Sequence, residues 1–510
     1  MPSVAIRPLK SPARGMGAKS KARGTLPVRL GILVLATLGL GSFSLRQFSG
    51  GGVRGASAES ELVRLGAASA AESSALPQEP ASAAQPQSGS CFDKYTWIQP
   101  ALDVWFEKAW AVANESTQTT EDALQALRDT MWNKYHPGMD EVILRPDGKG
   151  RVLMDILQVS PPNQQHKKRC MLGLLKDAVE AHNGELARLL GDREMHLIVE
   201  TEDFGVTWKA QKNKIPAFAM CTDDNHSDIP VPDFTYYCYP ETRYANSSWP
   251  AIQSLLQHKS DMLAWHERYS ELFHRSNWKV GPRRGLMPLL QRYDNGTGPK
   301  TSLEAFGAEL DIQDTGFVHV TQGKALRKHE HFVWLDGQCD YKYLIHTAGF
   351  SYSGGLKYKM ACGSMVFKFE STYKEFFEPA LQDQYHVVKL PAKHDGVDEG
   401  WFQNFTAPKI KEVVDRTIKL NFQPPIPKQG QDFVRDQLDM PALHCYWLGA
   451  LQRYAELYFL PKTARQLELE RQGGGSGGKA GGRRLTEGAA EAQEGMQLPF
   501  GGDPRLLAAA

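Results

Sequence analysis

Short apolar runs and amphipathic stretches alternate along the middle of the chain, from about residue 91 to residue 463. Apolar positions recur at helical spacing in 122–135 and 165–190, which predicts two amphipathic helices. Apolar runs bounded by turn residues predict buried strands at His196–Thr201, Ile215–Cys221, Tyr343–His346, Met365–Phe369 and Tyr385–Leu390. Such alternation is typical of α/β folds with parallel sheets. A head of ~370 residues is large enough for two lobes with a ligand cleft between them.

The N-terminal region joins a basic segment to an apolar one. Residues 1–29 hold seven Lys or Arg and no acid, and the run from Leu30 to Leu45, LGILVLATLGLGSFSL, carries no charge. A basic segment before an apolar run orients the N-terminus to the cytosol and the rest to the lumen. We therefore expect a signal-anchor at 30–46 of a single-pass type II protein in the Golgi or endoplasmic reticulum. A signal peptide cleaved near Ala56-Ser57-Ala58 is the alternative.

Low-complexity sequence flanks the predicted head on both sides. Residues 47–90 are dominated by Ala, Ser, Gly, Pro and Gln, and the end of the chain repeats this composition with GGGSGGKAGG. Such segments bury too little apolar surface to offset the entropy of ordering them. The predicted organisation is a cytosolic tail 1–29, an anchor 30–46, a disordered stem 47–90, a folded head 91–463 and a disordered tail 464–510.

Composition narrows the function classes. The formal net charge is +1, so no global field recruits nucleic acid, and we expect no nucleic-acid partner. Seven cysteines fit an oxidising compartment, where an odd number leaves one thiol free. Candidate glycosylation sites fit the same compartment, at Asn114, Asn225, Asn246, Asn295 and Asn404.

A Gly/Ser-rich loop is the first candidate site. The stretch Tyr341–Phe369, YKYLIHTAGFSYSGGLKYKMACGSMVFKF, predicts strand, loop, short helix and strand in that order. A loop of this kind before a helix exposes backbone N–H groups to an anion such as phosphate. An ordinary turn is the alternative interpretation. The candidate phosphate contacts are Gly349, Ser351, Ser353, Gly354, Gly355 and Lys357.

Two further stretches carry candidate chemistry. In LFHRSNWKVGPRR an apolar strand is followed by groups that could hold a pyrophosphate, unless the segment is a solvated basic turn. These groups are Arg275, Ser276, Arg283 and Arg284. In HLIVETED a buried strand ends in Glu200, Glu202 and Asp203, where a carboxylate could serve as general base or could simply be solvated.

Three motifs in fixed order resemble a known family. They are CDYKYL at Cys339–Leu344, CGSMVF at Cys362–Phe367 and the segment Phe433–Trp447 ending in CYW. With these motifs the head resembles the capsule-associated glycosyltransferases, which include Rumi, the protein O-glucosyltransferases and fungal capsule xylosyltransferases. The resemblance implies two facing Rossmann-like lobes, the GT-B arrangement, and inverting, metal-independent transfer. It also implies an acceptor lobe at about 91–255, a nucleotide-sugar lobe at about 256–430 and a closing C-terminal helix at about 431–463.

The resemblance assigns roles to individual positions. Asp203 matches the acidic residue proposed as base, and His226 and Asp228 match an element on the acceptor side. The matches to donor-binding positions are Ser276, Arg283 or Arg284, Ser353 and Lys357.

The sequence departs from the family pattern at three positions. His274 and Arg275 replace an arginine and a glycine of the strand before the basic segment. Gly355 stands where the donor loop is expected to carry an arginine. Such a loss could be compensated by Arg275, Arg283 or Arg284, or could mean a different donor or no activity.

The resemblance also implies two disulfides. They join Cys339 to Cys362, on both flanks of the donor loop, and Cys91 to Cys445, at the two ends of the head. A third pair, Cys221 with Cys238, leaves Cys170 free.

The predicted function is transfer of a hexose or pentose, glucose or xylose, from a UDP-sugar to a protein or glycan hydroxyl. No cofactor or metal is expected beyond the UDP-sugar co-substrate, and the membrane is contacted through one anchor. A catalytically silent, glycan- or protein-binding member of the family is the main alternative, because of Gly355. A metallohydrolase using His329 and His331, and a structural membrane protein, are further alternatives.

Overall fold

The computed structural model describes the folded head. The described residues are 90–131, 138–157, 165–239, 242, 244–276, 283, 310–314, 333–391, 401–420 and 423–460. The predicted anchor at 30–46, the stem before Ser90 and the tail 464–510 lie outside them, as do Asn295, Arg284, His329 and His331. Within the described ranges no helix is long and apolar enough to cross a membrane.

The first sheet is mixed, with strand order β2-β1-β3-β4-β5. Its strands are β1 (Met139–Pro146), β2 (Val152–Leu157), β3 (Met195–Glu200), β4 (Phe218–Ala219) and β5 (Ile229–Pro230). β3, β4 and β5 are parallel, but β1 runs antiparallel to both β2 and β3. The prediction of parallel sheets is therefore wrong for β1 and β2, which form a hairpin whose turn contains Gly148 and Gly150 at positive φ.

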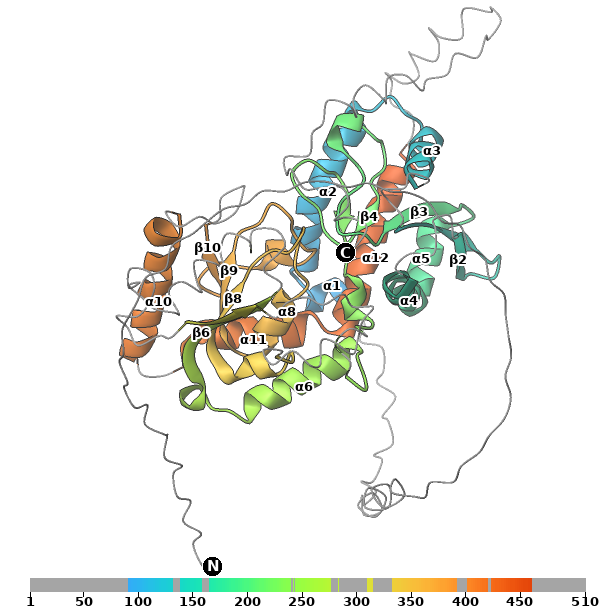
Figure 1. Cartoon of the computed structure of the whole chain (residues 1–510). Helices are drawn as coiled ribbons and strands as arrows, with labels where there is room; N and C mark the ends of the chain where they lie inside the picture. Colours follow the sequence, from blue (N-terminus) through green and yellow to red (C-terminus); the bar gives the residue numbers. More distant parts are fainter. Residues whose placement is uncertain are drawn as a thin grey trace, which may run out of the picture. The chain divides into compact units, whose positions relative to one another are not determined.

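The second sheet is entirely parallel, with strand order β10-β9-β8-β6-β7 (Figure 1). Its strands are β6 (Tyr269–Ser276), β7 (Leu310–Asp314), β8 (Tyr341–His346), β9 (Met365–Phe369) and β10 (Val388–Leu390). Every residue of β9 is buried, as expected for a central strand of a parallel sheet. The prediction of an α/β fold with parallel strands is confirmed here, because all five strands of this sheet run the same way.

The described helices include those predicted at 122–135 and 165–190, with different ends, and others that were not predicted. They are α1 (Cys91–Lys94), α2 (Ile98–Glu115), α3 (Thr120–Met131), α4 (Gln165–Ala181), α5 (Asn183–Leu190), α6 (Trp249–Asp261), α8 (Leu356–Ala361), α10 (Ala407–Leu420), α11 (Pro425–Gln437) and α12 (Met440–Tyr458). The predicted helix 165–190 is broken at His182 into α4 and α5. The segment 431–463 also contains a break, because the Asp439 side chain accepts the Ala442 N–H and caps a new helix.

Helix α12 packs into the core of the first sheet (Figure 1). The ring of Phe218 on β4 lies 5.5 Å from Trp447 and 5.1 Å from Tyr454, measured between centroids. The Tyr454 hydroxyl also donates to the backbone oxygen of His196 on β3, at 2.9 Å. The C-terminal helix thus completes the core around strands that come some 250 residues earlier in the chain.

Three disulfides tie the head together, and one differs from the prediction. Cys91–Cys445 and Cys339–Cys362 are confirmed. Cys238 pairs with Cys170, which leaves Cys221 as the free, buried cysteine, so the predicted Cys221–Cys238 pair is wrong. The reason is local packing: the Cys221 thiol donates to the backbone oxygen of Asp203 at 3.3 Å, whereas the turn that carries Cys238 packs on α4.

The described sequon asparagines are exposed: Asn114, Asn225, Asn246 and Asn404. Their glycosylation remains a prediction.

The disulfide pattern predicts a single reactive thiol per chain. With the protein unfolded in denaturant without reductant, we expect one equivalent of a thiol reagent to be incorporated. The folded protein should react far more slowly, because burial protects Cys221 and raises the pKa of its thiol well above the usual value. Cys221→Ala should abolish labelling in denaturant, measured by intact-protein mass spectrometry. Labelling that survives in this variant would contradict the assigned pairs.

Candidate functional site

The loop between β8 and α8 follows the carboxyl end of a central parallel strand, where α/β sheets bind their ligands. Its first turn closes when the Gly349 N–H donates to the Tyr352 oxygen at 3.0 Å. A Cβ at position 349 would lie 2.8 Å from that same oxygen, so only glycine fits here. The residues of the predicted phosphate loop are therefore in a tight, defined turn.

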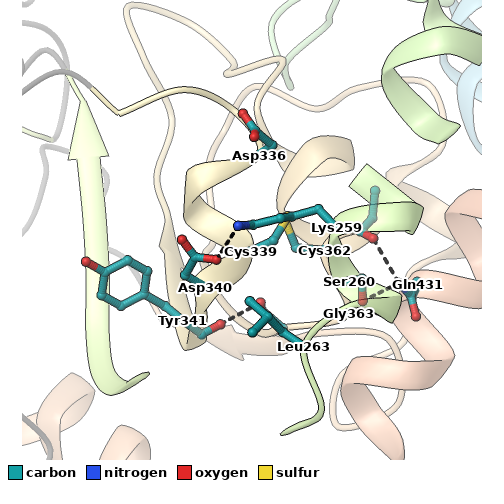
Figure 2. The surroundings of a disulfide bond; sticks show 12 residues. Lys259, Ser260, Leu263, Asp336, Cys339, Asp340, Tyr341, Cys362, Gly363 and Gln431 are labelled. Carbon is teal, nitrogen blue, oxygen red and sulfur yellow. Dashed lines mark hydrogen bonds and ion pairs between the residues drawn. A yellow bond between two sulfur atoms is a disulfide. The ribbon is translucent and has the colours of Figure 1, made fainter. Parts of the chain in front are cut away.

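A disulfide fixes both flanks of this loop (Figure 2). Cys339 lies directly before β8 and Cys362 directly after α8, so the bridge closes the strand–loop–helix unit. Gly363 follows at a φ of 60°, and a Cβ there would come within 3.0 Å of both the Ser260 hydroxyl and the Gln431 amide oxygen. The CGS motif of the sequence thus pins the end of α8 against α6 and α11.

Arg283 is a described cation that reaches the loop. Its guanidinium donates to the Ser353 hydroxyl at 3.1 Å and to the Thr347 hydroxyl at 3.3 Å. A Cβ at Gly349 would lie 3.5 Å from the same guanidinium, so the small residue leaves room for it. Burial lowers the pKa of Arg283 to about 10, which still leaves it charged at neutral pH. Two predicted donor-site residues, Arg283 and Ser353, are therefore in contact.

More nitrogen groups gather at this end of β8. The Lys359 ammonium donates to the Ile345 oxygen at 2.8 Å, and burial, with Arg283 nearby, lowers the pKa of Lys359 to about 7. His346 is buried, its Nδ1 has no hydrogen-bond partner among the residues that the structure describes, and burial holds its pKa well below the usual range. Among the described residues, no carboxylate forms an ion pair with Arg283 or Lys359. A buried positive cluster without a protein counter-ion is suited to a bound polyanion.

Lys357 occupies a different environment from the one that the sequence suggested. Its side chain is fully buried and its ammonium lies 3.5 Å from Asp233, 3.2 Å from the Gly354 oxygen and 4.0 Å from the centre of the Tyr236 ring. The Lys357 ammonium is therefore enclosed by protein, and it links the Gly354 backbone of the loop to Asp233. Tyr352 adds to this link, because its hydroxyl donates to the other Asp233 oxygen at 2.9 Å.

Asp233 was missed by the sequence reasoning. It is buried, and its Oδ1 accepts the N–H and the hydroxyl of Thr235, as in the cap of a short helical turn. A signal was present in Asp233-Phe-Thr, because an aspartate two residues before a threonine favours such a cap. Nothing in that pattern indicates that the same carboxylate also contacts Lys357 through Oδ1 and Tyr352 through Oδ2, more than a hundred residues later.

Glu200, the last residue of β3, and Asp203, which follows the strand, lie in different environments. Glu200 is fully buried, and burial raises its pKa well above the usual value, which favours the protonated form. Asp203 is the accessible one: its side chain is 42% exposed and its Oδ1 lies 3.3 Å from the Lys167 ammonium. Of Glu200 and Asp203, only Asp203 is placed to accept a proton from a substrate hydroxyl.

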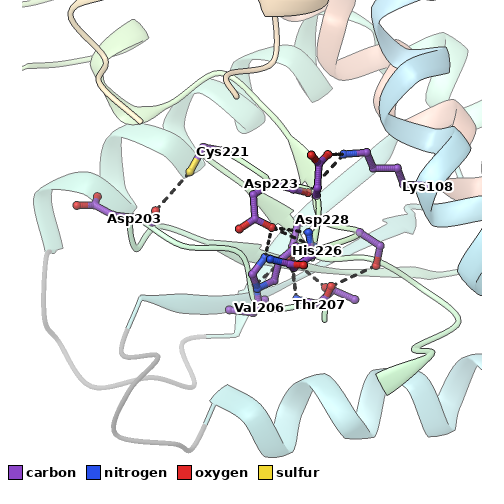
Figure 3. A network of polar contacts seen from close by, with 11 residues as sticks. Lys108, Asp203, Val206, Thr207, Cys221, Asp223, His226 and Asp228 are labelled. Carbon is purple, nitrogen blue, oxygen red and sulfur yellow. Dashed lines mark hydrogen bonds and ion pairs between the residues drawn. The ribbon is translucent and has the colours of Figure 1, made fainter. Parts of the chain in front are cut away.

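Asp228 holds the segment that follows Asp203 (Figure 3). Its carboxylate accepts the N–H groups of Val206 and Thr207 at 3.0–3.1 Å and the Thr207 hydroxyl at 3.0 Å. Burial nevertheless raises the pKa of Asp228. The predicted acceptor-side Asp228 is thus occupied by backbone groups and positions the loop.

His226 lies beside this clamp in a buried pair with Asp223. Its Nδ1 is 2.6 Å from the Asp223 carboxylate, and its ring packs on Trp208 at 4.1 Å between centroids. Burial alone would raise the pKa of Asp223, but the hydrogen bond and charge of His226 outweigh it and the pKa is lowered.

The segment that follows Asp203 contacts the loop between β8 and α8. The ring of Phe204, next to Asp203, lies 5.0 Å from the ring of Phe350 in the donor loop. The Tyr352 hydroxyl lies 3.5 Å from the Met220 sulfur, beside the free Cys221. The structure therefore brings Asp203 and Ser353 to loops that touch, and Arg283 contacts Ser353. It does not describe the side chains of Arg275 and Ser276, and Ser351 is buried.

We expect replacement of the two lysines of α8 to have different effects on stability. Lys357→Met leaves the buried Asp233 carboxylate without its cation and should cost about 3–5 kcal/mol of unfolding free energy. Lys359→Met is the matched control. The folded-state pKa of Lys359 is depressed, so charging this lysine below its unfolded pKa costs stability, and removing it at pH 7 should not destabilise.

Denaturant unfolding of both variants tests this prediction. The double variant Lys357→Met/Asp233→Asn should lose less than the sum of the two single losses, since the partners interact. Equal losses for Lys357→Met and Lys359→Met would contradict the assigned ion pair.

Comparison with known proteins adds independent evidence. Protein O-glucosyltransferase 1 of Rattus norvegicus is 26% identical over 310 residues, covering 58% of this chain and 71% of that protein. The human protein of that name is 24% identical over 320 residues, with 61% and 74% covered. O-glucosyltransferase rumi of Drosophila melanogaster is 25% identical over 308 residues, with 56% and 66% covered.

A solved structure titled "Crystal structure of GtfA/B complex" is similar over 37% of each chain, with 12% identity and a TM-score of 0.23, which is too low to inform the fold. The family model described as Glycosyl transferase family 90 matches residues 185–470. This match covers more than half of the chain and contains Asp203, Arg283 and the whole donor loop. The chain therefore belongs to glycosyl transferase family 90.

Proposed function

We propose that this protein transfers glucose or xylose from a UDP-sugar to a hydroxyl group of an acceptor, with inversion at the anomeric carbon. The observation that carries the proposal is the cationic cluster at the end of β8. Arg283 and Lys359 are partly buried there and have no carboxylate partner among the described residues, so the protein leaves positive charge for a ligand to neutralise. A nucleoside diphosphate supplies that charge as substrate and retains it as leaving group.

The donor's diphosphate would contact Arg283 and the Ser353 hydroxyl. These groups already touch at 3.1 Å, so little reorganisation is needed when the anion arrives. Negative charge grows on the diphosphate as the glycosidic bond breaks, and a fixed guanidinium stabilises it. We propose that these cations perform the charge neutralisation for which other transferases use a metal.

The acceptor would be activated by Asp203. Its carboxylate takes the proton of the acceptor hydroxyl while the oxygen attacks the anomeric carbon, and UDP leaves from the opposite face with the bonding electrons. One substitution of this kind inverts the configuration. Support comes from the exposure of Asp203 and from the Asp228 clamp, which holds the following segment through two backbone N–H groups.

The proposal extends to the acceptor and the compartment. Relatives named protein O-glucosyltransferase favour glucose as the sugar and a protein hydroxyl as the acceptor. Three disulfides favour an oxidising lumen, where the predicted anchor would hold the head. The GT-B arrangement, with the two sheets as facing lobes, is part of the same proposal.

The test is UDP release by the full-length protein in detergent, measured with UDP-glucose and UDP-xylose, with secreted glycoproteins as acceptors and chelator present. We expect acceptor-dependent turnover of one donor. Asp203→Asn should lower kcat about 10²–10⁴-fold, the usual contribution of a general base. Asp224→Asn is the matched control, because Asp224 is 88% exposed and pairs with Lys108 away from the loop.

Two outcomes would reject parts of the proposal. Loss of turnover with chelator, restored by a divalent ion, would reject metal independence. Binding of UDP without turnover of either donor would favour the catalytically silent alternative, for which Gly355 is the sequence feature.

A further inference from the structure

Helix α8 carries two lysines in different environments. Lys357 is sealed from solvent and neutralised by Asp233. Lys359, two residues later, is only partly buried, and its ammonium is held by a backbone oxygen, that of Ile345, at 2.8 Å. A lysine desolvated without a counter-ion lowers the stability of the fold, so its position calls for a functional reason.

The direction of the Lys359 side chain suggests a functional reason for its position. Residues four apart lie on the same face of a helix, and side chains lean toward the helix N-terminus. The Lys359 N–H donates to the Gly355 oxygen at 3.2 Å, so Lys359 stands one turn after Gly355 on the same face of α8. Its ammonium reaches the carboxyl end of β8, where Arg283 contacts Ser353.

At position 355 there is room for a side chain on this face of α8. A Cβ there would lie 3.6 Å from the Ser353 hydroxyl, an ordinary van der Waals distance, and Gly355 has a φ of −79°. Neither space nor backbone conformation therefore requires glycine. The missing side chain leaves the loop without a cation of its own, and the ammonium of Lys359 lies on the same side of the helix.

We propose that Lys359 is a diphosphate-binding residue of the donor site and supplies the positive charge that Gly355 cannot. The inference rests on the proposed function, because it assigns Lys359 to the same ligand. It goes beyond the sequence reasoning, which assigned the loop charge to Lys357 and placed nothing at Lys359.

The charge state of Lys359 makes the proposal measurable. Because the pKa of Lys359 is about 7 in the empty site, the lysine must take up a proton when the anion binds above that pH. Affinity for the anion is then full below pH 7 and falls as pH rises through the empty-site pKa. Other charged or titratable groups at this end of the sheet are Arg283, His346 on β8, His274 on β6, and Lys368 on β9, which pairs with Glu378 at 2.8 Å.

The experiment is calorimetric titration of the full-length protein with UDP between pH 6 and pH 8.5. Lys359→Met should weaken binding about tenfold to a hundredfold at pH 6.5, the usual range for a charge-assisted contact. Lys359→Arg keeps the charge at every pH. The wild-type affinity, divided by that of Lys359→Arg, should fall about tenfold between pH 7 and pH 8.5. Lys342→Met, at the other end of β8, should bind UDP like the wild type.

A rescue variant separates a charge role from a structural one. Adding Gly355→Arg to Lys359→Met should restore most of the lost UDP affinity, because the new guanidinium starts from the same helix face. UDP binding by Lys359→Met equal to wild type, or a wild-type/Lys359→Arg affinity ratio that does not change with pH, would overturn the assignment of Lys359 alone. Absence of UDP and pyrophosphate binding by the wild-type protein would overturn the proposed function as well.

Discussion

The donor loop depends on the buried ion pair between Lys357 and Asp233. The loop leaves β8 at a tight turn and its flanks are joined by the Cys339–Cys362 disulfide, so the start of α8 is the part that needs a further constraint. Lys357 provides that constraint by reaching down to a carboxylate from the 233–236 turn, while Tyr352 binds the second oxygen of the same carboxylate. Because both partners are buried, the pair is costly to break and tolerates little displacement. Arg283 and Ser353 are therefore presented in one geometry before any ligand arrives.

Lysines and acidic residues near this loop differ in their contacts and in their burial. Of the two lysines on α8, Lys357 is neutralised by Asp233, whereas Lys359 has no carboxylate partner among the described residues. Among the acids, the Asp228 carboxylate accepts hydrogen bonds from backbone N–H groups, and burial raises the pKa of Glu200. The side chain of Asp203, in contrast, remains accessible. Contacts such as Phe204 with Phe350 join the segment that follows Asp203 to the donor loop. The proposed proton acceptor and the proposed polyanion site would together supply what a glycosyl transfer requires.

The sequence predicted those parts of the fold that local patterns encode. Strand β9 was predicted with its correct ends, since a fully buried parallel strand is a continuous apolar run. The β1–β2 hairpin was not predicted, and the strand expected at 215–221 is only two residues long, because pairing partners decide where a strand ends. Arg283 and Ser353 were predicted as donor-site residues from the sequence and the family resemblance, and the structure places them in contact. Asp233 and Lys359 were not, because their roles depend on which side chains tertiary packing leaves neutralised.

The most direct measurement is hydrogen–deuterium exchange of the full-length protein with and without UDP. If the loop after β8 is the donor site, peptides covering 347–357 should exchange more slowly when UDP is bound, and peptides from α2 should not change. The same experiment with uridine, which lacks the phosphates, should show little protection in the loop. Protection by UDP that is confined to the first sheet, with 347–357 unaffected, would contradict the assignment of this loop as the nucleotide-sugar site.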